Sequence, residues 1–218
     1  MIEDNYVEAD LKGGLCIYVW GDEQEGAEGF DRECRQEMIN QFKREPGTKL
    51  GLHLGDSFDW LLPTMRARVV GQLIHDPSAR AQVSNMVRTA QDKALKELTP
   101  FEGRMIGCHE GHHSWRYEDG TSTDQRLASA LRTRYLGWIA ATQLRAKSGK
   151  GKHAWSGTLT LLSTHGGGNS TAIGSDAKKI SDLAMGTWAD MYFRGHSCKA
   201  MVTPGLERRM IRRGRLPG

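Results

Sequence analysis

The feature that most constrains this chain is the stretch at residues 49–60, KLGLHLGDSFDW, where a short apolar run ends at a glycine and two acids follow. An apolar run of this length that stops at glycine is typical of a buried strand. Asp56 and Asp59 would then lie at the carboxyl end of that strand, the edge where open α/β sheets bind their ligands. A single Gly-Asp after a strand is more often a turn with a capping acid, so this interpretation needs support from elsewhere in the chain.

The same pattern occurs four more times. Apolar runs that lead into polar loops lie at residues 15–20, 104–106, 158–163 and 190–193. Helical patterns lie around them at residues 27–45, 65–74, 79–98, 123–135 and 175–185. Strands that alternate with helices predict an α/β fold. Five polar loops at one edge of one sheet would bring together carboxylates and imidazoles, which are ligands for Mn, Fe or Zn.

Composition favours one globular domain. The chain has 218 residues, 38% of them hydrophobic and 26% charged, so we expect a single domain over residues 1–218. The formal net charge is +4, and much of the excess lies in a basic C-terminal tail at residues 206–218, which either contacts phosphates or is a solvated terminus. The four cysteines have no C-x-x-C spacing, which disfavours a disulfide framework and a zinc knuckle.

Membrane and export signals are not evident in the sequence. No apolar run approaches the length of a membrane span, and residues 1–12 lack the basic and then apolar layout of a signal peptide. We therefore expect a cytoplasmic protein with no membrane partner.

The five polar loops carry short motifs in a fixed order. These are Asp-Glu-Gln at residues 22–24, Gly-Asp-x-x-Asp at 55–59, Gly-Cys-His-Glu at 107–110, His-Gly at 165–166 and Gly-His-Ser-Cys at 195–198. As a set, they resemble the signature of the calcineurin-like metallophosphoesterases, and residues 164–199 look like bacterial and phage members of that family. The resemblance implies an αββα sandwich, with two mixed β-sheets flanked by helices and a site at the strand ends.

The resemblance also implies a dinuclear centre of two divalent metal ions, Mn, Zn or Fe. The residues that match the metal-ligand positions of the family are Asp22, Gln24, Asp56, Cys108, His165, His196 and Cys198. His109 matches the proton donor to the leaving group, and Asp59 would orient or support it. Three ligand positions depart from the family pattern, because Gln24 and Cys198 replace histidines and Cys108 replaces an asparagine. Zinc is favoured if the cysteines ligate, since a thiolate is a soft ligand.

The implied activity is hydrolysis of phosphate esters by a metal-bound hydroxide, with His109 as the proton donor. The chain has no insertion large enough for a cap domain, so we expect an open cleft and substrates that are phosphodiesters of nucleic acid or nucleotides. The alternative is a degenerate, non-catalytic member that binds phosphate, nucleic acid or a protein partner. His112 and His113 lie just past the third motif and either line the substrate cleft or face water.

Overall fold

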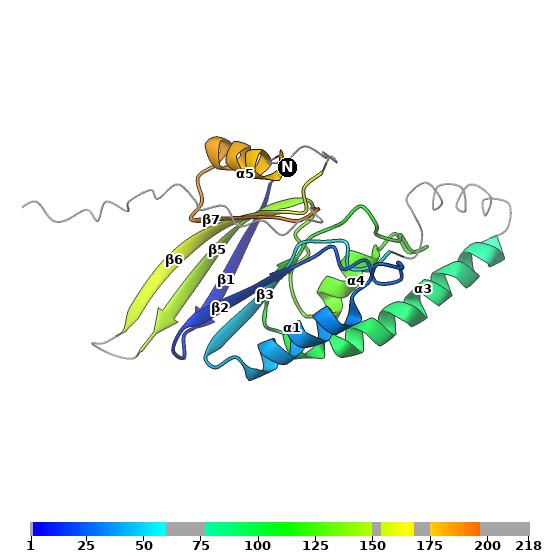
Figure 1. Cartoon of the computed structure of the whole chain (residues 1–218), viewed down its shortest axis with the longest axis horizontal. Coiled ribbons are helices and arrows are strands. Elements are labelled where there is room, and N and C mark those ends of the chain that lie inside the picture. The colour runs from blue at the N-terminus through cyan, green and yellow to red at the C-terminus, as the bar shows by residue number, and fades with distance from the viewer. Residues whose placement is uncertain (1, 60–76, 150–153, 168–174, 197–218) are drawn as a thin grey trace, which may run out of the picture.

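The computed structural model describes residues 2–59, 77–149, 154–167 and 175–196 (Figure 1). Strands and helices alternate over this part of the chain, so the predicted α/β class is confirmed. Its strands form two sheets, one parallel and one mixed. The helix expected at residues 65–74 and the basic tail at residues 206–218 lie outside the described residues.

The parallel sheet contains three of the predicted strands. In spatial order they are β2 (Leu15–Trp20), β3 (Thr48–His53) and β4 (Met105–Cys108). The connection from β2 to β3 contains α1 (Arg32–Arg44), and the segment before β4 contains α3 (Pro77–Glu97) and the 3₁₀ helix η1 (Thr99–Phe101). We expected two mixed sheets, but the described strands of this sheet all run in one direction.

Local sequence explains where two helices begin and end. Asp31 caps α1, because its side chain accepts a hydrogen bond from the Cys34 N–H at 2.8 Å, so the helix begins later than predicted. Helix α4 (Thr123–Ala130) begins with a capping box formed by Ser122 and Gln125. This helix ends earlier than predicted, and Arg132 just beyond it has a positive φ of 51°.

The mixed sheet contains strands from both ends of the described chain, at its two opposite edges. Its strands, in spatial order, are β1 (Glu3–Asp10), β5 (Ile139–Ser148), β6 (Trp155–Thr164) and β7 (Met191–Arg194). The β5 and β6 strands pair antiparallel, whereas β1 pairs parallel to β5 and β7 parallel to β6. Helix α5 (Ser175–Gly186) lies beside β7 (Figure 1). The sequence patterns did not indicate β1 or β5.

The two sheets share one core. Buried side chains from both sheets meet there, including Leu52 on β3, Ile106 on β4 and Leu144 on β5. Asn5 on β1 also joins the sheets, because its amide donates hydrogen bonds to the Ile106 carbonyl at 2.9 Å and to the Thr142 hydroxyl at 3.2 Å. This buried amide is therefore satisfied from both sides of the core.

A second core lies between the parallel sheet and its helices. It is formed by Ile39, Phe42, Leu98, Phe101, Met105, Cys108, Leu127, Ala128 and Leu131. Figure 1 shows α1, α3 and α4 on this side of the molecule. None of the helices in the described ranges combines the length and the apolar character needed to cross a membrane.

Candidate metal centre

The loops that follow five strands converge at one edge of the molecule. Backbone hydrogen bonds join the first two of these loops, from Asp22 N to Gly55 O and from Gln24 N to Asp56 O, both at 2.9 Å. The loop after β7 is joined to them because His196 N donates to Asp22 Oδ2 at 2.7 Å. We expected five loops at one edge of one sheet, whereas these loops come from the carboxyl ends of strands in both sheets.

Four residues of this edge have an unusual backbone conformation. Their φ values lie in the left-handed region that non-glycine residues rarely occupy: 55° for Asp22, 51° for Gln24, 55° for Asp56 and 56° for His196. Such strain persists only where the surrounding structure fixes it, and it concentrates at functional sites. The side chains of these loops are therefore candidates for a functional site.

Four of these side chains form a cluster that could hold a metal ion. It consists of Asp56, His112, His165 and His196, and one ligand atom from each lies within 4.8 Å of all the others. Asp56 and His165 are buried, His196 is half-buried and His112 is exposed. The cluster is therefore closed on one side and accessible on the other.

Hydrogen bonding fixes the orientation of the His165 ring. Its Nδ1 lies 2.7 Å from the Leu54 carbonyl oxygen, which can only accept, so Nδ1 carries the proton of the neutral ring. The lone pair on Nε2 then points to Asp56 Oδ2 at 3.2 Å and to His112 Nδ1 at 2.9 Å. Metal-binding histidines typically donate their other ring N–H to a carbonyl or carboxylate in this way.

Only one carboxylate oxygen of Asp56 accepts a hydrogen bond in the described part of the chain. Oδ1 accepts a hydrogen bond from His113 N at 2.8 Å. Oδ2 is buried and makes no hydrogen bond of acceptable geometry within the described residues. A buried carboxylate oxygen is costly unless it is paired with a cation or a donor. The donor set around it, three imidazoles and a carboxylate, is one that fits Zn or another transition-metal ion.

The pKa values of this pair agree with a requirement for positive charge. Burial raises the pKa of Asp56, but His165 and His113 together outweigh it, so the pKa lies below its usual range. Burial lowers the pKa of His165, whereas Asp56 raises it above its usual value. Asp56 therefore favours a positive charge on or beside the His165 ring. A proton and a metal ion are thus alternative ways to supply the same charge.

Two glycines allow the loops to approach each other. A Cβ on Gly111 would lie 1.9 Å from Asp56 Oδ1, so no side chain fits at this position without moving the carboxylate. Gly55 has a φ of 96°, and a Cβ there would lie 2.8 Å from the His165 Nδ1. The Gly111 N–H also donates to the buried Asp124 Oδ2 at 2.9 Å, which holds the third loop in place.

A second histidine of the third loop lies between the cluster and Asp59. Nδ1 of His113 is 2.8 Å from Asp59 Oδ2, and its Nε2 is 3.9 Å from Asp56 Oδ2. The His113 side chain is 16% exposed, so it remains accessible from solvent. Asp59 was predicted to support a histidine, and the structure pairs it with His113 instead of His109.

The structure does not bring Cys108 and His109 into the cluster. Cys108 is fully buried in the core between the sheet and the helices, and burial raises the pKa of its thiol. His109 is also fully buried, and its ring nitrogens contact Gly137 O at 2.9 Å and Ser163 Oγ at 2.8 Å. Burial lowers the pKa of His109 to about 4, which makes it a poor proton donor near neutral pH.

Cys108 and His109 lie outside the cluster because β4 is longer than the motif suggests. Cys108 pairs with His53 on β3, and His109 N donates to the His53 carbonyl at 2.9 Å, so both residues continue the sheet. The third loop begins only after them and supplies His112 and His113. The sequence held one signal for this alternative, because Gly-x-His occurs twice, at residues 107–109 and 111–113.

The remaining predicted ligands are Asp22, Gln24 and Cys198. Asp22 lies next to the cluster, where its Oδ2 accepts from His196 N, and burial raises its pKa. Gln24 is half-buried, and its backbone N–H donates to the Asp56 carbonyl. Cys198 lies outside the described residues.

Buried ion pairs hold the loop that follows β2 in place. The Arg35 side chain is 1% exposed, and it contacts Glu23 Oε1 at 2.7 Å through Nε and Glu25 Oε2 at 2.5 Å through Nη1. Glu23 also lies 3.6 Å from His53 Nε2. A buried charge must be paired, and this network ties the loop after β2 to helix α1.

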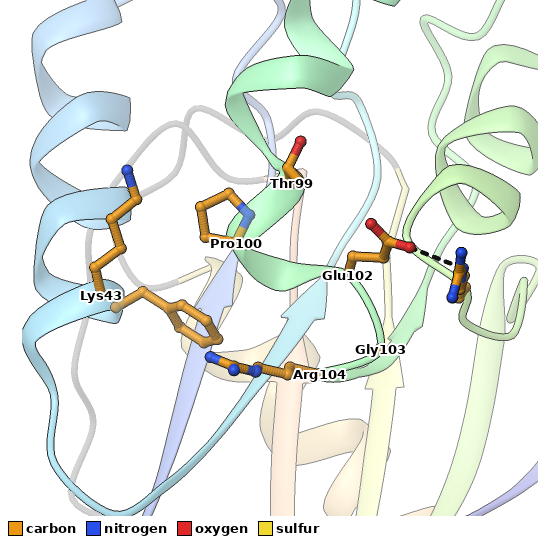
Figure 2. Close-up of a pocket in the computed structure, with 8 residues that line it drawn as sticks. Lys43, Thr99, Pro100, Glu102, Gly103 and Arg104 are labelled. Carbon is orange, nitrogen blue, oxygen red and sulfur yellow. Dashed lines mark ion pairs between the residues drawn. The ribbon is translucent and has the colours of Figure 1, made fainter.

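A separate hollow of about 310 Å³ lies at the opposite ends of the parallel strands (Figure 2). Its lining residues are Phe42, Lys43, Thr99, Pro100, Glu102, Gly103, Arg104 and Arg132. Glu102 pairs with Arg132 at 2.7 Å, which is the ion pair dashed in Figure 2. None of the candidate site residues lines it.

Comparison of the chain with models of known protein families, with curated proteins and with solved structures found no match in any of the three. Its function is therefore inferred from the geometry of the site.

Proposed function

We propose that this protein is a metal-dependent hydrolase of phosphate esters, with its reaction centre at the Asp56 cluster. One observation carries the proposal: the buried Oδ2 of Asp56 has no hydrogen bond to any described residue and lies beside imidazole nitrogens. The resemblance to calcineurin-like metallophosphoesterases points to the same chemistry. The two sheets with outer helices also fit the αββα sandwich that this resemblance implies.

The chain's own residues divide into ligands and supports. Asp56, His112, His165 and His196 would hold the ion, while Leu54 and Asp22 orient His165 and His196. A divalent ion held there would lower the pKa of a water from about 15.7 toward about 7 and would polarise phosphoryl oxygens. For the other ion that the resemblance implies, the ligands would be Asp22, Gln24, Asp56 and Cys198.

We assign the proton donor for the leaving oxygen to His113. Its ring is accessible, lies next to Asp56 and contacts the Asp59 carboxylate, which can orient a protonated imidazole. A general acid must reach the atom that it protonates, and the His113 ring meets this requirement whereas the enclosed His109 ring does not.

Hydrolysis of bis(4-nitrophenyl) phosphate tests the proposal. Protein treated with a chelator should be inactive, and added Zn²⁺ or Mn²⁺ should restore activity. His165→Asn should reduce the restored rate by at least about 100-fold, since it removes a ligand. The matched control is His109→Asn, which alters another buried imidazole that also contacts a carbonyl through Nδ1.

Two results would contradict the proposal. One is no hydrolysis with any added ion, which would favour the non-catalytic binding protein. The other is equal activity in His165→Asn and His109→Asn, with folding of both variants checked by circular dichroism.

A further inference from the structure

An exposed tryptophan lies beside the metal cluster. Trp138 is 44% exposed although it is large and apolar. The centroid of its indole lies 4.8 Å from the His112 ring and 5.9 Å from the His165 ring. The accessible side of the cluster is therefore bordered by an aromatic side chain.

The backbone of Trp138 is held in place by the site loops. Its carbonyl accepts hydrogen bonds from Thr164 Oγ1 at 2.7 Å and from His165 N at 3.2 Å. The preceding carbonyl, of Gly137, accepts from Glu110 N and from the His109 ring, both at 2.9 Å. Four contacts thus fix this short segment relative to the cluster.

The indole contributes only part of its surface to the fold. Among the described residues, the indole makes an edge-on ring contact with His112 and a tilted ring contact with His165. Its exposed fraction leaves aromatic surface open to solvent on the accessible side of the cluster. An aromatic side chain on a fixed backbone, with open surface next to a metal centre that would bind phosphoryl oxygens, suits a ligand that joins a flat ring to a phosphate.

We propose that Trp138 is a platform on which the base of a nucleotide phosphate ester stacks while its phosphate occupies the cluster. This inference rests on the proposed function and specifies the class of substrate. Every nucleobase has a π-face, so stacking on an indole would be tolerant of base identity. Trp138 would thus determine specificity for nucleotides over other phosphate esters without taking part in the reaction.

Binding of two ligands that differ only in the base tests this inference. Adenosine 5′-monophosphate and ribose 5-phosphate share the phosphate and the sugar, and calorimetric titration of Zn²⁺-loaded protein gives a dissociation constant for each. We expect the nucleotide to bind about tenfold more tightly, as a stacked base typically contributes. In Trp138→Ala this ratio should fall to about 1, with the affinity for ribose 5-phosphate unchanged.

Two further variants control for general effects. Trp138→Phe retains an aromatic face and should keep most of the preference for the nucleotide. Trp155→Ala removes a tryptophan that is 56% exposed at the far end of β6 and should keep all of it. Equal binding of both ligands by the unaltered protein, or a preference that persists in Trp138→Ala, would overturn the inference.

Two comparisons separate this inference from its alternatives. Hydrolysis of bis(4-nitrophenyl) phosphate without a Trp138-dependent base preference would contradict the platform alone. A Trp138-dependent base preference without hydrolysis would contradict the proposed reaction alone. O-Phosphotyrosine and O-phosphoserine form a second pair of ligands, which tests for a phenol ring instead of a base. If the Trp138-dependent preference is stronger for O-phosphotyrosine over O-phosphoserine than for the nucleotide over ribose 5-phosphate, the assignment to a base is wrong.

Discussion

Asp56 Oδ2 lies 3.2 Å from His165 Nε2, and both side chains are completely shielded from solvent. His165 uses its other nitrogen to contact the Leu54 carbonyl, so the lone pair of the neutral ring faces the carboxylate. Two electron-rich atoms in this position require a positive charge between them or on one of them. The proposed metal dependence of this protein follows from this relationship.

The first prediction concerns the proton donor. His113→Gln should lower kcat by roughly 100-fold or more, because general acid catalysis typically contributes that much. The loss should be larger for an ester with an alkoxide leaving group than for one that releases nitrophenolate, which needs little protonation. The measurement is kcat for both esters in the variant and the unaltered protein. An equal loss for both esters, or bound metal lost together with activity, would show that His113 has another role.

The second prediction concerns Cys108, which the sequence motif assigned as a ligand. Cys108→Ala should retain all bound metal and lose only about 1 kcal/mol of unfolding free energy, because the thiol is a buried, neutral core group. His112→Ala should lose metal instead. Elemental analysis of both variants, together with urea unfolding, checks this. Loss of metal from Cys108→Ala would return the residue to the ligand set.

The third prediction is a pH dependence of stability due to His109. Its pKa falls from an ordinary 6.5 to about 4 on folding, so the unfolded chain binds the proton more readily between these values. The neutral ring therefore contributes stability above pH 6.5, and this contribution is lost as the pH falls toward 4. Relative to His109→Gln, the unaltered protein should lose up to about 3 kcal/mol over this range.

Urea unfolding of both proteins at several pH values measures this difference. Comparison of the two proteins cancels other buried groups, including Asp124, whose pKa burial raises to about 6. A difference that stays constant from about pH 7 to about pH 4 would show that the His109 ring is not enclosed as the structure has it.

The fourth prediction tests the close approach of the third loop to Asp56. Gly111→Ala places a Cβ where Asp56 Oδ1 lies, so the variant should lose metal and at least about 1–3 kcal/mol of unfolding free energy. Gly14→Ala is the matched control, because a Cβ there would meet nothing within 4 Å and the φ of Gly14 is not in the left-handed region. Thermal unfolding and metal analysis of both variants check this. Similar behaviour of the two would contradict the packing of this loop.

The sequence predicted those parts of the fold that have a strong apolar signal. Strands β2, β3, β4, β6 and β7 were found because each contains a run of large hydrophobic residues. Strand β1 was missed because its buried positions are Asn5 and Ala9, which give little hydrophobic periodicity. Strand β5 was missed for a related reason, since Ala140, Thr142 and Ala146 are among its buried residues. Their burial follows from sheet pairing, which is not visible in a short window of sequence.

The site was predictable where a loop begins directly after its strand. Asp56 and His165 follow strand ends closely, and the structure places them in the cluster with His196. The third loop was different, because the backbone N–H of His109 still pairs with β3 and the loop begins later. The sequence could not show that pairing, so His112 and His113 were left undecided between the cleft and water.

The most direct test of metal binding at this cluster is the divalent metal content of the purified protein, compared with Asp56→Asn. This substitution keeps the shape of the side chain and removes the charge that the cluster needs. We expect at least about one bound divalent ion per chain in the unaltered protein after dialysis, and little or none in the variant. No retained metal, even after dialysis against Zn²⁺ or Mn²⁺, would contradict the proposal. Equal metal content in both proteins would likewise show that Asp56 is not the centre of the site.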